Sequence, residues 1–307
     1  MNNIQEIEGP RGLKGWYTNM MSAGWVVPTF VATWICIVVI PLVIMVYFSF
    51  LDVRYYEVYY DEPSFKIWWS IIESGRWMAV TRTLRITATL TIIQLLIAFP
   101  FALWLAKGCQ SKGVKASIIT LLTIPFFLDA SSRIIVWRPI LGTNGVINTV
   151  LMDLGIINQP MEWMLFSEFA VHFGMLAPYF PTMVFPIFLV LTLIDDEYIQ
   201  ASRDLGASPG QTLFHVILPL SLPGIVAGVV FTMVPLMAAF VEPGMLGGGF
   251  VNVLGDSIEA ALRNLKYPTA AAMSTLVMIL LALLLVVLVV ISRRRGALGN
   301  IFQTMKR

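Results

Sequence analysis

The chain has 307 residues, of which 58% are hydrophobic and only 12% are charged, with a net charge of +2. Because a soluble domain carries about 25% charged residues, this composition indicates a polytopic membrane protein. The small net charge gives no reason to expect nucleic-acid binding, and two cysteines without a paired spacing argue against a disulfide framework or a zinc site.

The N-terminal part of the chain begins with residues 1–23, which are polar and mixed in charge. The first apolar run, Gly24–Leu51, then continues for 28 residues without a charge. A signal-peptide core has about 7–15 apolar residues. We therefore expect this run to stay in the membrane as an anchor.

Six apolar runs are long enough to cross a bilayer, which takes about 20 predominantly apolar residues. Backbone in lipid must satisfy its own hydrogen bonds, and the runs do not alternate as barrel strands do, so they are predicted to be helices. They lie at roughly 24–51, 82–107, 116–138, 165–194, 217–241 and 268–292. The predicted fold class is all-α, a polytopic bundle of six transmembrane helices.

The placement of Lys and Arg residues predicts the orientation of these spans. Basic residues are more frequent on the side that holds both termini, which includes the loop with Lys107, Lys112 and Lys115. By the positive-inside rule this side is the cytoplasm. We therefore expect a cytoplasmic segment 1–23, one transmembrane domain 24–292 and a basic cytoplasmic tail 293–307.

Charged residues inside the predicted spans are costly and are usually paired or functional. Asp129 lies about 20 Å along the third span from its cytoplasmic end at 1.5 Å per residue. Arg133 follows four residues later, so an Asp129–Arg133 pair is expected in the outer half. Glu168 and Glu242 fall at the outer ends of the next two spans, and we expect the three carboxylates to converge at a similar depth.

This convergence predicts a substrate path at the outer side of the bundle. The candidate residues are Asp129, Arg133, Trp137, Glu168, Tyr179, Phe180 and Glu242. Carboxylates beside aromatic faces suit a cationic solute. Two alternatives stay open: structural pairing of the carboxylates with Arg82, Arg85, Arg133 and Arg138, and an anionic or zwitterionic solute.

Residues 195–217 form a polar, charge-bearing loop between two long apolar runs. Acidic residues at 195–197 favour a helix start, and Gly206 favours a left-handed break after it. Ser208-Pro209-Gly210-Gln211 then predicts a second helix start with a capping box. A helix–break–helix is expected, the alternative being an amphipathic connector that lies on the membrane surface.

The spacing Gln200-Ala201-Ser202, then Gly206, then Val216-x-Leu218-Pro219 resembles the EAA loop of permease subunits in bacterial ATP-binding-cassette (ABC) importers. Gln200 and Val216 stand where the family pattern has Glu and Ile.

Thr123–Ile157 and Leu218–Gly249 are similar to the polyamine (spermidine/putrescine) permease subfamily, which groups with permeases for opines and phosphonates. The similarity covers most of residues 80–292.

The resemblance implies a type I ABC importer permease fold in the bacterial inner membrane. It implies two ATPase subunits, a second permease, expected to be a paralogue, and an external solute-binding protein as partners. ATP and Mg²⁺ would bind the ATPase, because this chain has no G-x-x-x-x-G-K-[ST] motif. No cofactor, metal or enzymatic activity is expected on this chain. The residues implied in ATPase coupling are Gln200, Ala201, Ser202, Arg203, Asp204, Leu205, Gly206, Leu213, Phe214 and Pro219.

Two other classes of protein could account for parts of this sequence. A secondary transporter driven by an ion gradient would use Asp129, Glu168 or Glu242 as an ion site. Such folds often contain inverted repeats, and none is seen in this sequence. A membrane scaffold would explain the hydrophobicity but not the 195–217 loop. His172 and His215 are isolated, so neither predicts catalysis.

Overall fold

The structure, a computed structural model, describes residues 24, 26–54, 57–59 and 63–294. The expected segment 1–23 and residues 295–307 of the expected tail lie outside the described residues. In chain order the elements, with η for π- or 3₁₀-helical turns, are α2 (Val26–Trp34), η1 (Ile35–Val39), α3 (Ile40–Phe48), β1 (Asp52–Arg54), β2 (Glu57–Tyr59), α4 (Lys66–Glu73), α5 (Trp77–Leu103), η2 (Trp104–Gly108), α6 (Lys112–Thr123), η3 (Ile124–Phe127), α7 (Ala130–Ile135), α8 (Trp137–Leu141), α9 (Val146–Asp153), η4 (Glu162–Met164), α10 (Glu168–Leu193), α11 (Asp196–Asp204), α12 (Pro209–Thr212), η5 (Leu213–Ile217), α13 (Leu218–Ala238), α14 (Val241–Gly247), α15 (Leu254–Arg263) and α16 (Tyr267–Arg294).

The helical content and the number of spans confirm the predicted fold class. Six helical segments are long and apolar enough to cross a membrane: Val26–Phe48, Trp77–Gly108, Ala130–Asp153, Glu168–Leu193, Pro209–Ala238 and Tyr267–Leu288. The short antiparallel pair β1–β2, in which Asp52 lies opposite Tyr59, was not predicted from the sequence.

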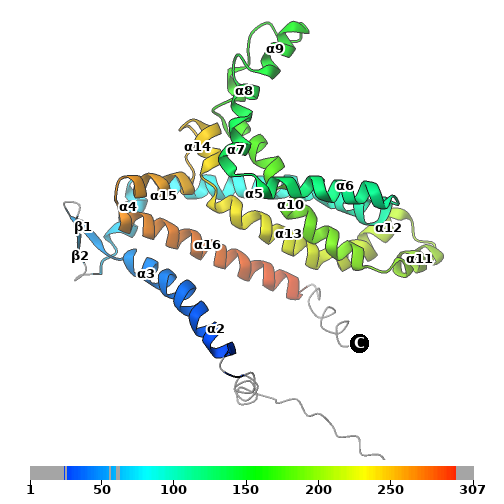
Figure 1. Cartoon of the computed structure of the whole chain (residues 1–307), viewed down its shortest axis with the longest axis horizontal. Helices are drawn as coiled ribbons and strands as arrows, with labels where there is room; N and C mark the ends of the chain where they lie inside the picture. Colours follow the sequence, from blue (N-terminus) through cyan, green and yellow to red (C-terminus); the bar gives the residue numbers. More distant parts are fainter. Residues whose placement is uncertain (1–23, 25, 55–56, 60–62, 295–307) are drawn as a thin grey trace, which may run out of the picture.

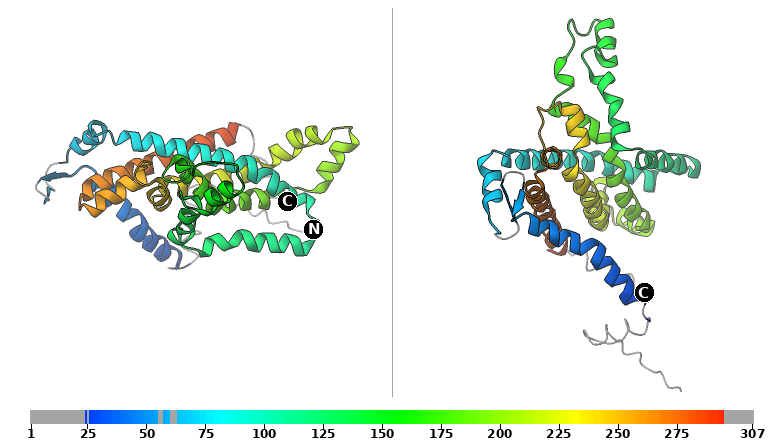
Figure 2. Two further views of the ribbon diagram at one scale, coloured as in Figure 1. Left: turned by 90° about the horizontal axis from the view of Figure 1, so that it is seen from above. Right: turned by 60° about the vertical axis from the view of Figure 1, so that its left-hand side comes forward.

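The bundle is built around α10, which packs against both α5 and α13. α16 runs along the same bundle, while α2 diverges from it (Figures 1 and 2). α11 and α12 lie at one end of the bundle, and α4, α15 and the β1–β2 pair lie at the opposite end (Figure 1). The 195–217 loop, which contains α11 and α12, and the segments with α4, α15 and the β1–β2 pair therefore lie at opposite ends of the spans (Figure 1).

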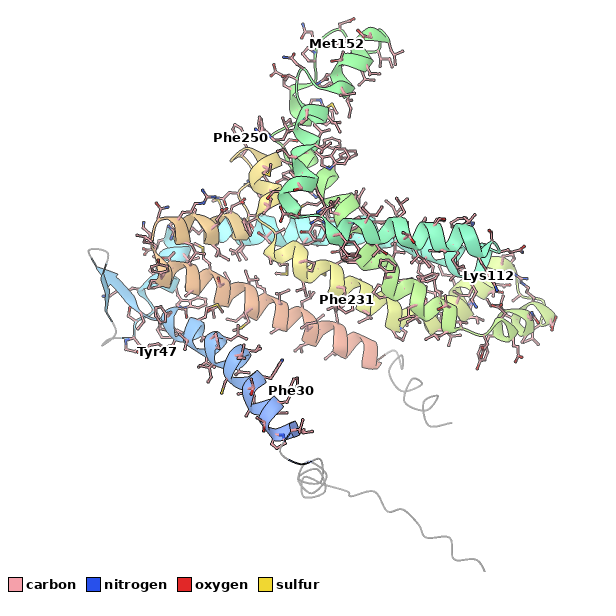
Figure 3. The ribbon with its side chains drawn as sticks, in the orientation of Figure 1. Phe30, Tyr47, Lys112, Met152, Phe231 and Phe250 are labelled. Carbon is pink, nitrogen blue, oxygen red and sulfur yellow. The ribbon has the colours of Figure 1, made fainter. Side chains whose placement is uncertain are left out.

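The third predicted span, 116–138, is not one continuous helix. α6 and η3 run along the bundle, but the backbone is extended at Leu128, and Asp129 then caps α7 by accepting a 2.9 Å hydrogen bond from the Ser131 backbone N–H. α7, α8 and α9 project sideways from the bundle, with Met152 near the far end (Figures 1 and 3). An N-cap inside an apolar run starts a new helix with a new direction.

Two glycines allow α13 to approach α10 closely. A Cβ on Gly224 would lie 2.8 Å from the Pro186 carbonyl oxygen, and one on Gly228 would lie 2.9 Å from that of Met183. Small residues at such spacing let helix backbones pack closely within a membrane. This packing connects the 195–217 loop, which joins α10 to α13, firmly to the centre of the bundle.

Candidate functional site

The 195–217 loop has the helix–break–helix structure that the sequence predicts. α11 ends before Gly206, which adopts the left-handed conformation with φ of +82°. α12 begins with the expected capping box: the Ser208 N–H donates to Gln211 Oε1 at 2.8 Å, and the Gln211 N–H donates to Ser208 Oγ at 3.3 Å. Both features are local in sequence, which is why they could be predicted.

Two side-chain contacts hold this loop as one body. The Ser202 and Thr212 hydroxyls lie 3.0 Å apart and join α11 to α12. In η2, which continues α5, Lys107 Nζ lies 2.6 Å from Asp196 Oδ1 and also donates to the Ile194 carbonyl. A displacement of the loop would therefore be passed to α5 as well as to α10 and α13.

The surface of the loop presents apolar side chains to the outside. Leu205 is 89% exposed and lies outside the six apolar spans, while Phe214, also exposed, lies near the start of the fifth. Of the other residues implied in coupling, Ser202 and Leu213 are half-buried, and the following are exposed: Gln200, Ala201, Arg203, Asp204, Gly206 and Pro219. Exposed apolar patches rimmed by polar residues are typical of protein interaction sites.

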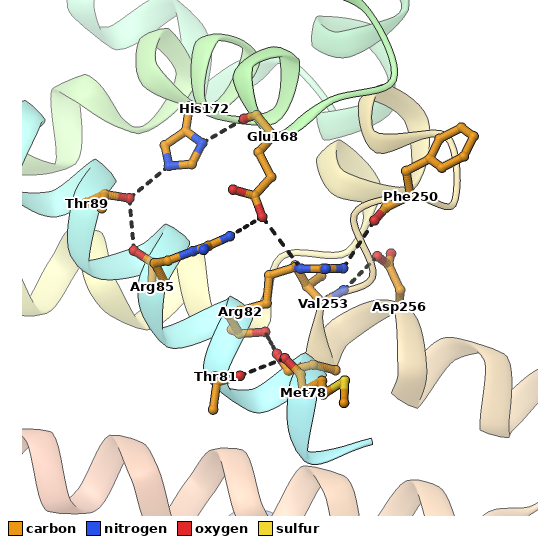
Figure 4. A network of polar contacts seen from close by, with 12 residues as sticks. Met78, Thr81, Arg82, Arg85, Thr89, Glu168, His172, Phe250, Val253 and Asp256 are labelled. Carbon is orange, nitrogen blue, oxygen red and sulfur yellow. Dashed lines mark hydrogen bonds and ion pairs between the residues drawn. The ribbon is translucent and has the colours of Figure 1, made fainter. Parts of the chain in front are cut away.

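A polar cluster lies at the opposite end of the bundle, where α5 and α10 begin (Figure 4). Glu168 forms an ion pair with Arg85 and a second one with Arg82, whose Nε lies 3.6 Å from Glu168 Oε1. Arg82 also donates to the Phe250 carbonyl at 3.1 Å. His172 Nε2 lies 2.8 Å from the Thr89 hydroxyl. Two guanidinium groups on one carboxylate leave this cluster with a net positive charge.

The neighbouring segment before α15 carries a second carboxyl group. Asp256 accepts a 3.3 Å hydrogen bond from the Val253 N–H. Burial raises the pKa of Asp256 to about 6, the hydrogen bond from Val253 opposes this shift, and the charge of Glu259 adds to it. Removal from water disfavours the ionised carboxylate, so this group titrates well above an ordinary aspartate.

Glu242 contacts α10 through a residue further along that helix than Glu168. It is 1% exposed and accepts a 3.0 Å hydrogen bond from the Tyr179 hydroxyl of α10. Tyr179 follows Glu168 by eleven residues, or about 16 Å along the helix. Glu168 and Glu242 thus have different partners, and the convergence of the three carboxylates stays a prediction. The alternative of structural pairing with Arg82 and Arg85 is confirmed for Glu168.

The expected Asp129–Arg133 pair is wrong. Asp129 caps α7, while Arg133 Nη1 lies 3.4 Å from the Pro125 carbonyl and its Nε is buried without a hydrogen-bond partner. The four-residue spacing pairs side chains only within one continuous helix, with both side chains free to meet. Here Asp129 is the capping residue before the helix begins.

Aromatic side chains form a ladder between α8 and α10. Trp137 packs edge-on against Phe173 with ring centroids 5.0 Å apart, Phe173 stacks on Phe169 at 5.8 Å, and Phe169 meets Trp163 at 5.1 Å. Phe180 lies outside this group and packs on Phe101. Of the predicted aromatic residues, Trp137 thus belongs to the ladder, while Tyr179 and Phe180 do not.

A row of buried polar residues on α5 was not predicted, because the candidates within the spans were charged or aromatic residues and not uncharged polar ones. Thr83, Thr87, Thr91 and Gln94 recur at helical spacing and are buried. The Thr83 hydroxyl accepts a 2.8 Å hydrogen bond from the Leu254 N–H, and Gln94 Nε2 donates to the Leu176 carbonyl at 3.1 Å. The spacing of polar residues within an apolar run was the signal that could have found them.

Across the described ranges, no group of three or more His, Cys, Asp or Glu residues is arranged to hold a metal ion.

An apolar six-span bundle with an ordered loop at one end is the architecture of a polytopic membrane protein. The chain belongs to the family of binding-protein-dependent transport system inner membrane components, whose profile matches residues 90–296. It is therefore a multi-pass inner-membrane permease subunit of an ABC importer.

Several relatives share about a third of their matched residues with the chain. It is 34% identical to the spermidine/putrescine transport system permease protein PotB of Haemophilus influenzae over 196 residues, which cover 64% of this chain and 68% of PotB. PotB of Escherichia coli K12 is also 34% identical, over 60% of this chain and 66% of its own length. YdcU, an inner membrane ABC transporter permease of the same strain, is 30% identical over 64% of this chain and 65% of YdcU.

A solved structure confirms the fold. A chain of a bacterial alginate ABC transporter, in complex with a periplasmic protein that holds an alginate pentasaccharide, superposes with a TM-score of 0.66. The match covers 93% of this chain and 98% of the other at 17% sequence identity.

Proposed function

We propose that this chain is one of two permease subunits of an ATP-driven importer, and that its 195–217 loop docks into a separate ATPase. The observation that carries this proposal is the loop itself, which is internally bonded, joined to α5 through Lys107, and exposes Leu205 at 89%. An apolar side chain so exposed on an ordered loop fits an anchor in a partner's groove, with Arg203 and Asp204 at its rim.

In this proposal the chain forms the path of the solute and passes the motion of the ATPase to the membrane spans, but it does not hydrolyse ATP. ATP with Mg²⁺ binds and is hydrolysed on two partner ATPase subunits. Closure of the ATPase pair moves the loop, the spans tilt, and the path opens to an external solute-binding protein. Hydrolysis resets the transporter to its inward-facing state.

The proposed solute is a polyamine or a similar cationic or zwitterionic compound, because the PotB relatives are named for spermidine and putrescine. The cluster around Glu168 does not favour a cation, since Arg82 and Arg85 neutralise its one carboxylate. We therefore assign most of the solute selection to the external binding protein. The aromatic ladder of Trp137, Phe173, Phe169 and Trp163 remains a surface on which ammonium groups would bind favourably.

A gradient-driven transporter finds little support in the geometry. Glu242 would be its ion site, yet Glu242 is buried and engaged by Tyr179. Under the proposed function, the conservative variant Glu242→Gln changes stability more than the ion dependence of uptake.

Co-purification tests the assembly. The tagged chain is extracted from its native membrane in mild detergent, and the proteins that accompany it are identified. We expect a P-loop ATPase and a second six-span permease. Recovery of the chain alone, still competent for gradient-driven uptake in vesicles, would overturn the proposal.

Solute identity needs a separate measurement. The binding protein encoded with the importer is purified and titrated calorimetrically with spermidine, putrescine, an opine and a phosphonate. We expect saturable binding of a polyamine, and polyamine-dependent stimulation of ATP hydrolysis when binding protein and transporter are combined in proteoliposomes. Preferential binding of the opine or the phosphonate would replace the proposed solute while leaving the coupling proposal standing.

A further inference from the structure

The short helix α4 carries three parallel stripes of side chains. Ile67 and Ile71, one turn apart, are buried against α16. Phe65, Trp69 and Ile72, at helical spacing, are exposed at 74%, 63% and 56%. The third stripe is polar and contains Lys66, Ser70 and Glu73. One apolar stripe is therefore covered by protein, a second apolar stripe is bare, and the polar stripe separates them on the remaining side.

The position of α4 along α16 gives its depth in a membrane. α4 packs on Ala272 and Met273, five and six residues after the start of α16 at Tyr267, or about 8 Å along the helix. The span Tyr267–Leu288 is about 33 Å long at 1.5 Å per residue, close to the hydrocarbon thickness of about 30 Å. α4 thus lies near the boundary between headgroups and acyl chains, at the end of the bundle away from the 195–217 loop (Figure 1).

The same face of α16 continues below α4 as an apolar surface. Ala272 is followed at intervals of seven, eleven and fourteen residues by Ile279, Leu283 and Val286, all of which are exposed. These intervals are close to two, three and four helical turns. The face of α16 that α4 covers at Ala272 is therefore apolar and exposed further along this membrane-spanning helix.

From this arrangement we infer that α4 is an interfacial helix, which inserts Phe65, Trp69 and Ile72 into the phospholipid layer and turns Lys66, Ser70 and Glu73 toward water. Helices of this kind lie in the membrane plane with the apolar face about 5–10 Å into the headgroup and acyl boundary. Trp is enriched at that level because its ring is amphipathic, and Phe is common on the apolar face of such helices. Trp77, at the start of α5 just after the Gly75 turn, is a second exposed tryptophan near α4 in the sequence.

This inference requires only that the chain spans a membrane, so its test is independent of the proposed coupling and solute. Cys36 and Cys109 are replaced by serine, and single cysteines are introduced as Trp69→Cys and, as the matched control on the polar stripe, Glu73→Cys. Each is labelled with the environment-sensitive fluorophore NBD in the complete transporter reconstituted in phospholipid nanodiscs. Quenching is measured with lipid that carries a doxyl group near the headgroup and with aqueous iodide.

The label at position 69 is expected to emit at shorter wavelength and to be quenched several-fold more strongly by doxyl lipid than the label at position 73, with the opposite order for iodide. Ile72→Cys, on the same stripe, provides a second probe if Trp69→Cys does not assemble. Quenching of positions 69 and 72 by iodide would overturn the inference. Protection of both positions from doxyl lipid and iodide would also overturn it, because a protein partner rather than lipid would then cover the stripe.

Discussion

Lys107 lies in η2, which continues α5, and it holds the 195–217 loop in place. Its ammonium group lies 2.6 Å from Asp196 Oδ1 and donates to the Ile194 carbonyl. Because the Asp196 side chain is largely exposed, the ion pair by itself contributes about 1 kcal/mol or less. The main effect of the contact is to fix the position of the loop relative to a membrane span.

Replacing Lys107 by alanine is expected to weaken coupling more than folding. We predict that uptake falls about tenfold, as about 1.4 kcal/mol of lost coupling free energy would give, while ATP hydrolysis by the assembled transporter changes much less. The matched control is Lys112→Ala, a neighbouring lysine that is exposed at the start of α6 (Figure 3). Equal loss of uptake in both variants would mean that only the charge of this surface matters.

Asp256 makes the stability of the α15 region depend on pH. Its pKa is raised from 3.8 in an ordinary aspartate to about 6, mainly by burial. Since the folded state holds the proton more tightly than the unfolded state, the free energy of unfolding contributed by this group falls as pH rises from about 4 to 6. Below about pH 4 the group is protonated in both states and the penalty is absent.

The variant Asp256→Asn should remove this part of the pH dependence. Its amide oxygen can still accept the hydrogen bond from the Val253 N–H, so the helix start is kept. We predict that the midpoint of thermal unfolding in detergent, followed by circular dichroism, falls less between pH 4 and 6 in the variant than in the parent. Parallel curves for the two proteins would contradict the assignment.

At the scale of elements, the break at Gly206 fixes the angle between α11 and α12. A Cβ at this position would meet nothing within 4 Å, so space does not require glycine there, but the φ of +82° does. A β-branched residue in the left-handed region costs on the order of 1–3 kcal/mol. The break would then relax to another geometry and redirect Leu205.

Gly206→Val is therefore expected to abolish ATP-coupled uptake while the permease still assembles with its partners. The control is Gly210→Val, in the same loop, where the added side chain also meets open space but the backbone is not left-handed. Uptake assays in proteoliposomes, with co-purification of the ATPase as the measure of assembly, separate the two variants. Unchanged uptake in Gly206→Val would contradict a coupling role for this loop.

Elements defined by local rules were predictable, and those defined by tertiary contacts were not. The capping box at Ser208 and the left-handed Gly206 depend on a few adjacent residues. The pairing of Glu168 with Arg85 joins residues 83 positions apart, so the sequence could offer it only as an alternative. The break at Leu128 was missed because an apolar run continues through it, although Asp129 is a strong N-cap residue.

At the scale of the whole molecule, the two ends of the bundle differ in kind. One end carries the 195–217 loop together with Lys107, Lys112 and Lys115. The other carries α4, α15 and the polar cluster around Glu168 (Figures 1 and 4). By the positive-inside rule we predict that the lysine-rich end faces the cytoplasm, where ATP is available. The coupling proposal depends on this orientation, so the orientation itself is a prediction that can fail.

Cys109 is a native reporter of that orientation, since it lies between Lys107 and Lys112 and is partly exposed. With Cys36 replaced by serine, a membrane-impermeant maleimide should label Cys109 in inside-out vesicles but not in right-side-out vesicles. Asn252→Cys in a Cys109→Ser background, at an exposed position of the other end, should show the reverse. If Cys109 were labelled from outside, Leu205 and Phe214 would face away from the nucleotide, and no docking of an ATPase on this loop could be maintained.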